Sequence, residues 1–280
     1  PAPQTDPQGP TTGKLHVLRG GCFQTIPNNT RSATRFGGEG TWPAYGLRLV
    51  CERTAGPFPP PGAVAATPTS AGPPPAVAAP PAVTDPASER ATALAVLAKK
   101  GRIKVRVGGQ VVQEYIDQPA ALPPAPFELV EVSFYNIAAA GDQDLALLRN
   151  ATAIETLVLN STQVSDQGLA ALQNLKQLRM LKLPGTQVRG PGLVHLASLP
   201  QLRELIFADQ SLNNSVSQTV GMLRNLEHLE MVRSQVSDVS FVRSLPNLTN
   251  LNFGGSRVHA LVGFETLGNL KFLNLWKTDI

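Results

Sequence analysis

Residues Leu178 to Val188 read L-R-M-L-K-L-P-G-T-Q-V, and this stretch decides the fold. Its pattern, L-x-x-L-x-L-x-x-T-x-V, returns at intervals of 22 to 25 residues. The seven copies open at Leu129, Ile154, Leu178, Leu202, Leu226, Leu248 and Leu270. A near-constant period indicates one small unit that is copied and stacked, so we predict a solenoid of seven repeats over 129–280, the last one incomplete.

Within each repeat, the L-x-L alternation predicts a short strand whose alternate Leu, Phe or Met side chains point into the core. The expected strands are Thr156–Asn160, Met180–Pro184, Glu204–Ala208, His228–Val232, Asn250–Gly254 and Phe272–Trp276. A helical return should follow, with Asp166 as an N-cap candidate in the second repeat. The last two intervals shorten to 22 residues, which favours 3₁₀-like returns.

Small hydroxyl residues recur two positions beyond the strands. They are Thr162, Thr186, Ser234, Ser256 and Thr278, with Gln210 as the exception. We expect these hydroxyls to bond the buried backbone where the chain leaves each strand.

The repeats resemble the leucine-rich repeat family, and the form T-x-V-S-D-x-G-L at Thr162 to Leu169 is similar to the bacterial variety with repeats near 24 residues. The resemblance implies an α/β solenoid with a parallel sheet on the concave side and helices or 3₁₀ turns outside. It also implies that the solenoid mediates protein–protein contacts.

The outward side chains of the strands should form three rows across the concave sheet. The first is Glu131, Thr156, Met180, Glu204, His228, Asn250 and Phe272; the second is Ser133, Val158, Lys182, Ile206, Glu230, Asn252 and Asn274; the third is Tyr135, Asn160, Pro184, Ala208, Val232, Gly254 and Trp276. Our candidate partner-binding residues are Tyr135, Val158, Lys182, Ile206, His228, Glu230, Phe272 and Trp276. Further repeats that cover Phe272 and Trp276 are the alternative for those two residues.

Residues 87–128 should cap the first repeat, because a solenoid needs its terminal apolar edge covered. A helix is expected over 87–100, a half-buried strand over 102–107, and a second strand over 111–116. The basic row Lys99, Lys100, Arg102, Lys104 and Arg106 is interpreted mainly as a solvated face, with contact to nucleic acid or an acidic partner as the alternative.

Residues 54–86 form a Pro/Ala-rich linker in which 11 of 33 positions are Pro. Such a composition cannot bury enough apolar surface to offset the conformational entropy of the chain. We therefore predict a disordered, extended spacer.

Residues 5–53 contain D-P-x-G-P at 6–10, V-L-R-G-G-C-F at 17–23, R-S-A-T-R at 31–35 and G-L-R-L-V at 46–50. This order of motifs resembles the C-terminal end of the formylglycine-generating enzyme, or sulfatase-modifying factor, family, which has a mixed lectin-like fold. That family's copper-using members carry a reactive cysteine pair shortly after the G-G motif. Cys22 and Cys51 match neither position, so we predict no catalytic residue and no copper, iron or other cofactor in this part of the family's domain.

The overall composition argues against several functional and structural classes of protein. The repeat region 128–280 carries 12 basic and 13 acidic residues, which argues against nucleic-acid binding. Two cysteines make neither a disulfide framework nor a metal site, and no run approaches a membrane helix. Because the chain begins with Pro1 and ends in mid-repeat at Ile280, we interpret it as a monomeric fragment of a larger bacterial protein. Its compartment stays open between the cell envelope, which we favour, and the cytoplasm.

Three functional hypotheses follow. The first is a protein-interaction or scaffold module that binds a protein partner through the concave face. The second is an enzyme of the formylglycine-generating class, whose repeats recruit substrate. The third is a signalling protein, such as a kinase that carries these domains outside the membrane. The His228–Glu230 pair has no nucleophile or metal cluster nearby in the sequence, which disfavours catalysis on the solenoid itself.

Overall fold

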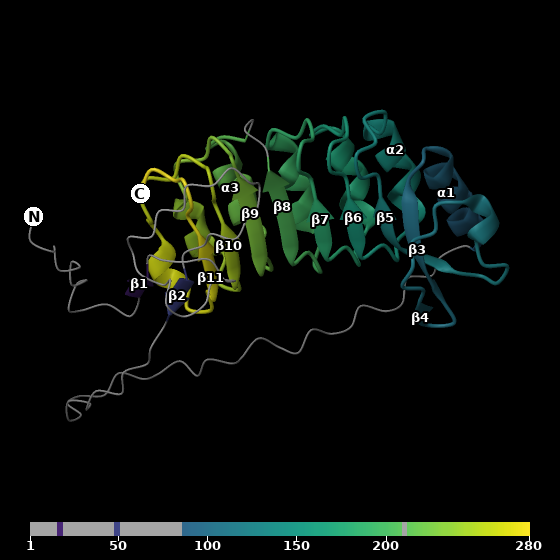
Figure 1. Cartoon of the computed structure of the whole chain (residues 1–280), viewed down its shortest axis with the longest axis horizontal. Helices are drawn as coiled ribbons and strands as arrows, with labels where there is room; N and C mark the ends of the chain where they lie inside the picture. Colours follow the sequence, from purple (N-terminus) through teal and green to yellow (C-terminus); the bar gives the residue numbers. More distant parts are fainter. Residues whose placement is uncertain (1–15, 19–47, 51–85, 209–211) are drawn as a thin grey trace, which may run out of the picture.

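A computed structural model describes residues 16–18, 48–50, 86–208 and 212–280 of this protein (Figure 1). Its main feature is a nine-stranded sheet in the order β11-β10-β9-β8-β7-β6-β5-β3-β4. Seven of these strands run parallel, one per repeat: β5 (Glu128–Ser133), β6 (Thr156–Val158), β7 (Met180–Lys182), β8 (Glu204–Ala208), β9 (His228–Val232), β10 (Asn250–Asn252) and β11 (Phe272–Asn274). The mixed α/β solenoid predicted from the leucine pattern is therefore present.

The leucine pattern forms the core because alternate strand residues face the same side of the sheet. Leu157, Leu181, Leu205, Leu229 and Leu251 are aligned by the strand pairing and are fully buried. Burying one such side chain stabilises the fold by about 1.5–3 kcal/mol. Four predicted strands continue two residues too far, since β6, β7, β10 and β11 leave the pairing after three residues.

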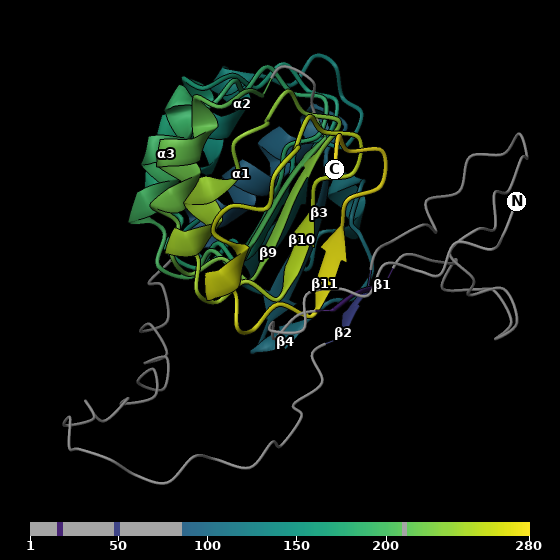
Figure 2. The same cartoon turned by 90° about the vertical axis from the view of Figure 1, so that its left-hand side faces the viewer.

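The returns between the strands stack on one side of the sheet (Figure 2). They are α2 (Asp142–Leu147) with η3 (Leu148–Asn150), then η4 (Gly168–Asn174), η5 (Pro191–Ser198), α3 (Val216–Gly221), η6 (Ser240–Ser244) and η7 (Phe264–Thr266), where η denotes a 3₁₀ helix. The two shortened repeats do contain the expected 3₁₀ returns, η6 and η7. Because η4 and η5 are also 3₁₀ helices in 24-residue repeats, repeat length alone does not determine this choice.

The aspartates of the returns connect neighbouring repeats. Asp166 accepts hydrogen bonds from the backbone N–H groups of Arg189, Gly190 and Gly192 at 2.8–3.0 Å, and Asp142 accepts one from Ser165 in the same way at 2.7 Å. The prediction that Asp166 caps its own helix is wrong, because η4 begins after Gln167 without a side-chain cap. The aspartate satisfies orphan N–H groups one repeat further along the chain.

The recurrent hydroxyl residues divide into two groups. Thr162, Thr186 and Thr278 donate to the carbonyl oxygen three residues earlier at 2.7–2.8 Å, as predicted. Ser234 and Ser256 are buried at the equivalent positions, but their hydroxyls have no partner. The threonine copies therefore gain a buried hydrogen bond that the serine copies lack.

The first repeat is covered by α1 (Pro86–Ala98), β3 (Arg102–Val107), β4 (Gln110–Val111) and η2 (Pro119–Ala121). β3 pairs antiparallel with β5 and buries Ile103 and Val105. The expected second strand over 111–116 is reduced to β4 and one bridge at Ile116. The apolar end of the solenoid is thus closed by an antiparallel strand and a helix.

The basic row of β3 is only partly solvated, in contrast to our interpretation. Lys104 Nζ lies 3.3 Å from a carboxylate oxygen of Glu131, and Arg106 bonds both Glu128 at 2.9 Å and Glu155. Two of the predicted solvent-facing cations therefore hold the cap to the first two repeats.

Near the N-terminus, β1 (His16–Leu18) and β2 (Arg48–Val50) pair antiparallel. The other residues of 1–53 for which we made predictions, including Cys22, Cys51 and the enzyme-like motifs, lie outside the described residues, as do almost all of the linker and Gln210. The resemblance to the formylglycine-generating family remains a prediction. The division of the chain into an enzyme-like segment (1–53), a linker (54–86), a cap (87–128) and repeats (129–280) also remains a prediction. In the part of the chain that is described, no helix has the length and apolar character needed to cross a membrane.

Candidate interaction surface

The face of the sheet that points away from the helical returns, which we call the open face, presents every second residue of β6 to β11 to solvent. On β6, for example, Thr156 and Val158 are half-buried while Leu157 between them is fully buried. On β5 the prediction fails for Ser133, which is buried. Strand pairing aligns the first two predicted rows residue by residue from β5 to β11. The open face is therefore a continuous surface built from one short segment of each repeat.

Four candidate residues lie together in the second row. Val158, Lys182, Ile206 and Glu230 occupy adjacent strands β6 to β9 in register. Since neighbouring strands lie about 4.8 Å apart, these side chains span roughly 14 Å. An aliphatic side chain, Ile206, is thus flanked by one cation and one anion.

The remaining candidates are spread further apart. Tyr135 follows β5 and is 56% exposed, whereas Trp276 follows β11 and is 49% exposed. Six strand spacings separate them, or roughly 29 Å. Phe272 lies on β11 in the first row, half-buried, and the Lys277 ammonium lies 4.6 Å from the centroid of the Trp276 ring. The eight candidates therefore do not form one pocket, and they mark an extended surface.

A polar cluster occupies the middle of the open face. His228 Nε2 lies 2.8 Å from Glu230 Oε1, and His228 Nδ1 lies 3.6 Å from Glu204 Oε2 on the neighbouring strand. Asn252 Nδ2 donates to the second oxygen of Glu230 at 3.4 Å. The hydrogen bond that His228 donates to Glu230 raises the pKa of His228, and the attraction of both carboxylates adds to this shift against the opposing effect of burial.

His228 contacts two carboxylates in this cluster. The side chains that bond His228 are carboxylates, which hold its proton, and the hydroxyl or thiol nucleophile of an acid–base pair does not appear among its partners. Within the described ranges, no group of three or more His, Cys, Asp and Glu could hold a metal ion. Sequence reasoning placed Glu204 in the first row but missed its role, because the contact crosses from β8 to β9.

The cap covers the first end of the open face. Tyr115 donates a hydrogen bond to Glu131, and the Lys104 ammonium lies 4.6 Å from the centroid of the Tyr115 ring. Burial, followed by the bond to Glu131, raises the pKa of Tyr115 to about 12. The usable part of the open face therefore begins at β6.

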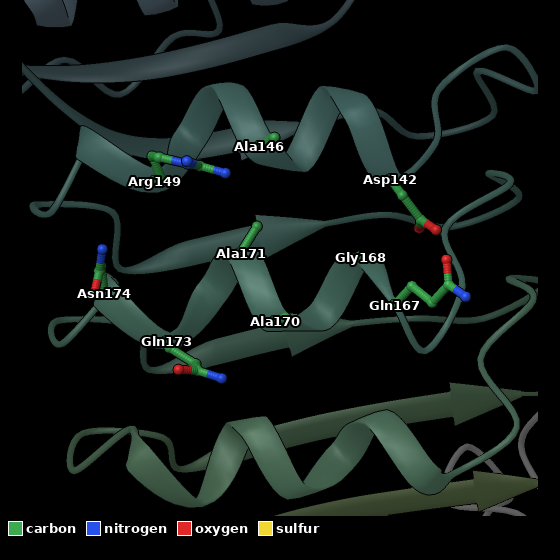
Figure 3. Close-up of a pocket in the computed structure, with 9 residues that line it drawn as sticks. All are labelled: Asp142, Ala146, Arg149, Gln167, Gly168, Ala170, Ala171, Gln173 and Asn174. Atoms are coloured by element: carbon green, nitrogen blue, oxygen red, sulfur yellow. The ribbon is translucent and has the colours of Figure 1, made fainter.

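On the opposite side of the solenoid, the returns enclose two shallow hollows. One, of about 380 Å³, lies between α2 with η3 and η4, where small residues such as Ala146, Ala170 and Ala171 line it (Figure 3). Its two charged groups, Asp142 and Arg149, stand at opposite ends. The other hollow, of about 600 Å³, lies between α3 and η6. The leucine pattern did not predict these two hollows, because both hollows depend on how returns of unequal length stack on one another.

No protein-family model and no curated protein matches this sequence. Among solved structures, internalin C2 from Listeria monocytogenes is similar over 52% of this chain and 80% of its own, with 19% identity and a TM-score of 0.36. The plant peptide hormone receptor RGFR1 in complex with RGF2 is similar over 48% of this chain, with 19% identity and a TM-score of 0.38. A PEPR1–AtPEP1 structure is similar over 68% of this chain, with 14% identity and a TM-score of 0.43.

This chain spans only 22% of the RGFR1 chain and 28% of the chain in the PEPR1–AtPEP1 structure. The assignment of a leucine-rich repeat solenoid rests on the seven repeats and the parallel strand pairing seen in this chain itself.

Proposed function

We propose that the repeats form a protein-interaction module whose ligand lies across the open face from β6 to β11. The observation that carries this proposal is the register of the open face, which places Ile206 between Lys182 and Glu230 in one continuous row. Apolar side chains surrounded by charged groups are typical of the centre of a protein interface.

The shape of the surface supports a macromolecular ligand. The row of side chains extends over roughly 24 Å from β6 to β11, and the two hollows described above lie on the opposite side of the solenoid. Small molecules are usually bound in enclosed clefts, whereas an extended row of mixed side chains suits a protein segment. Both signs of charge lie close together on the surface, which favours a partner of mixed charge over a polyanion.

The test compares two matched substitutions in the full 280-residue chain. Ile206→Glu places a charge at the centre of the open face, and Val194→Glu places the same charge on η5, where Val194 is 45% exposed on the opposite side. Affinity capture from the source organism, followed by mass spectrometry, should yield proteins that bind the wild type and Val194→Glu but not Ile206→Glu.

We expect the loss to be at least thirtyfold, because a central contact residue contributes about 2 kcal/mol or more. Direct binding of a captured and purified protein gives this number. Equal binding by wild type and Ile206→Glu, with both variants folded by circular dichroism, would contradict the proposal.

A further inference from the structure

The larger hollow on the return side has an apolar floor. It lies between α3 and η6 and is lined by Ser217, Gln218, Gly221, Met222, Arg224, Ser240, Phe241, Arg243 and Ser244. Phe241 is 7% exposed and closes the floor, while Met222 is 48% exposed at the rim. An exposed methionine beside an aromatic floor offers an adaptable surface for an aliphatic side chain.

Gly221 lines the hollow and has no side chain to occupy it. A Cβ atom at this position would lie 3.5 Å from Phe241 Cβ and 3.8 Å from Ser244 Cβ, which is ordinary contact. A larger side chain at 221 would therefore occupy the hollow without a clash at its own Cβ. This geometry provides a way to block the hollow while leaving its charges in place.

Two guanidinium groups line the same hollow, and no acidic residue lines it. In the described part of the chain, neither Arg224 nor Arg243 has a carboxylate within ion-pairing distance. The Asp238 carboxylate accepts a hydrogen bond from the Ser240 N–H at 2.9 Å, and this bond, with a smaller effect of the Arg243 charge, lowers the pKa of Asp238. The smaller hollow differs, because Asp142 and Arg149 both line it (Figure 3).

We propose that the hollow between α3 and η6 is a second binding site, which takes a short acidic protein segment that also carries an aliphatic side chain. The aliphatic group covers Phe241 and Met222, and flanking carboxylates pair with Arg224 and Arg243. Guanidinium groups bind carboxylates through two parallel hydrogen bonds, which gives the pairing direction as well as strength. This site is independent of the open face and extends the function proposed above.

The test uses a photo-crosslinking peptide with the full chain. The peptide carries four Asp or Glu residues around a central photoreactive leucine analogue, and a second peptide has Lys in place of every acid. After irradiation, mass spectrometry should locate the acidic peptide on the segments around Met222 and Phe241. The yield should fall as salt is raised from 50 to 500 mM, because exposed ion pairs are screened.

Arg224→Glu combined with Arg243→Glu should lower the crosslinking yield about tenfold, since two exposed ion pairs are lost and replaced by repulsion. Arg149→Glu, a matched exposed arginine in the smaller hollow, should leave the yield unchanged. Gly221→Leu should also abolish crosslinking, because the leucine side chain fills the hollow. If the double arginine variant does not fold, the crosslinking yield of Gly221→Leu tests the proposed site. Ile206→Glu should have no effect, which separates this site from the open face.

Crosslinks scattered over the chain, an equal yield from the Lys peptide, or an unchanged yield in both Gly221→Leu and the double arginine variant would overturn the proposal.

Discussion

Glu89 is a carboxyl group buried at the junction between the cap and the first repeat. It is 1% exposed, and Oε2 accepts a hydrogen bond from the Leu129 N–H at 3.0 Å, while Oε1 has no partner. Burial raises the pKa of Glu89 to about 7 from 4.5; the Leu129 bond opposes this shift, and the neighbouring Glu128 charge adds to it. The folded cap therefore prefers the protonated acid.

The direction of the pH effect follows from this preference. Glu89 does not weaken the fold below pH 4.5, where it is protonated in both the folded and unfolded states. Its ionisation costs stability progressively as the pH rises from 4.5 to about 7, and the loss is complete above that range. The shift corresponds to about 3 kcal/mol, because one pKa unit is equivalent to about 1.4 kcal/mol.

Glu89→Gln removes the ionisation and keeps an oxygen that can accept from Leu129. We expect the variant to gain about 3 kcal/mol relative to wild type between pH 4.5 and pH 8, measured by urea unfolding under circular dichroism. Hydrogen exchange over 86–133 should show the same gain at the Leu129 amide. Glu114→Gln removes one exposed carboxylate from the cap and should stay within about 0.5 kcal/mol of wild type. A wild-type-to-Glu89→Gln difference that is the same at both pH values would refute the reasoning.

Four further substitutions test the packing and the open face. Gly192→Ala should destabilise by about 2 kcal/mol or more in urea unfolding, because its Cβ would lie 2.3 Å from the Asp166 carbonyl oxygen. The pKa of His228, followed by NMR, should lie above 6.5 and fall in Glu230→Gln; the stabilisation from this pair is present below pH 6.5 and is lost as the pH rises through the raised pKa. Thr186→Val should cost about 1–2 kcal/mol, whereas Ser234→Ala should be nearly neutral, because only the threonine hydroxyl is bonded.

Much of the solenoid could be predicted because its signals are local and repeated. Leu157 and Leu181 are spaced by one repeat, and burial of one requires burial of the other. The order of the rows on the open face follows from the same spacing, since a constant period fixes the register of parallel strands. The function of these rows does not follow from the register, so the eight candidate residues stay predictions.

Features that arise between repeats were not accessible from the pattern. A residue after the strand adopts a left-handed backbone in six of the seven repeats, at Asn136 (φ 59°), Ser161 (58°), Gly185 (67°), Arg233 (53°), Gly255 (70°) and Lys277 (55°), and the corresponding position of the fourth repeat lies outside the described residues. Asn and Gly are typical of that conformation, but Arg is not. The residue types at this position therefore do not reveal the shared left-handed backbone. The aspartate bonds and the arginine-lined hollow likewise depend on which returns become neighbours in space.

The bonds between returns also determine where the open face is most rigid. Asp166 joins the third repeat to the second through three N–H groups, and Asn214 accepts from the Ser237 and Asp238 N–H groups at 2.9 and 3.0 Å. Asp238 does not bond the next repeat in this way, because its carboxylate accepts from the N–H of Ser240 in its own repeat. These polar contacts join the repeats of β6 and β7 and the repeats of β8 and β9, and they add to the leucine stacking over β6 to β9. A rigid surface loses less entropy on binding, so Ile206, at the centre of this segment, should contribute more to affinity than the more exposed Trp276 beyond it.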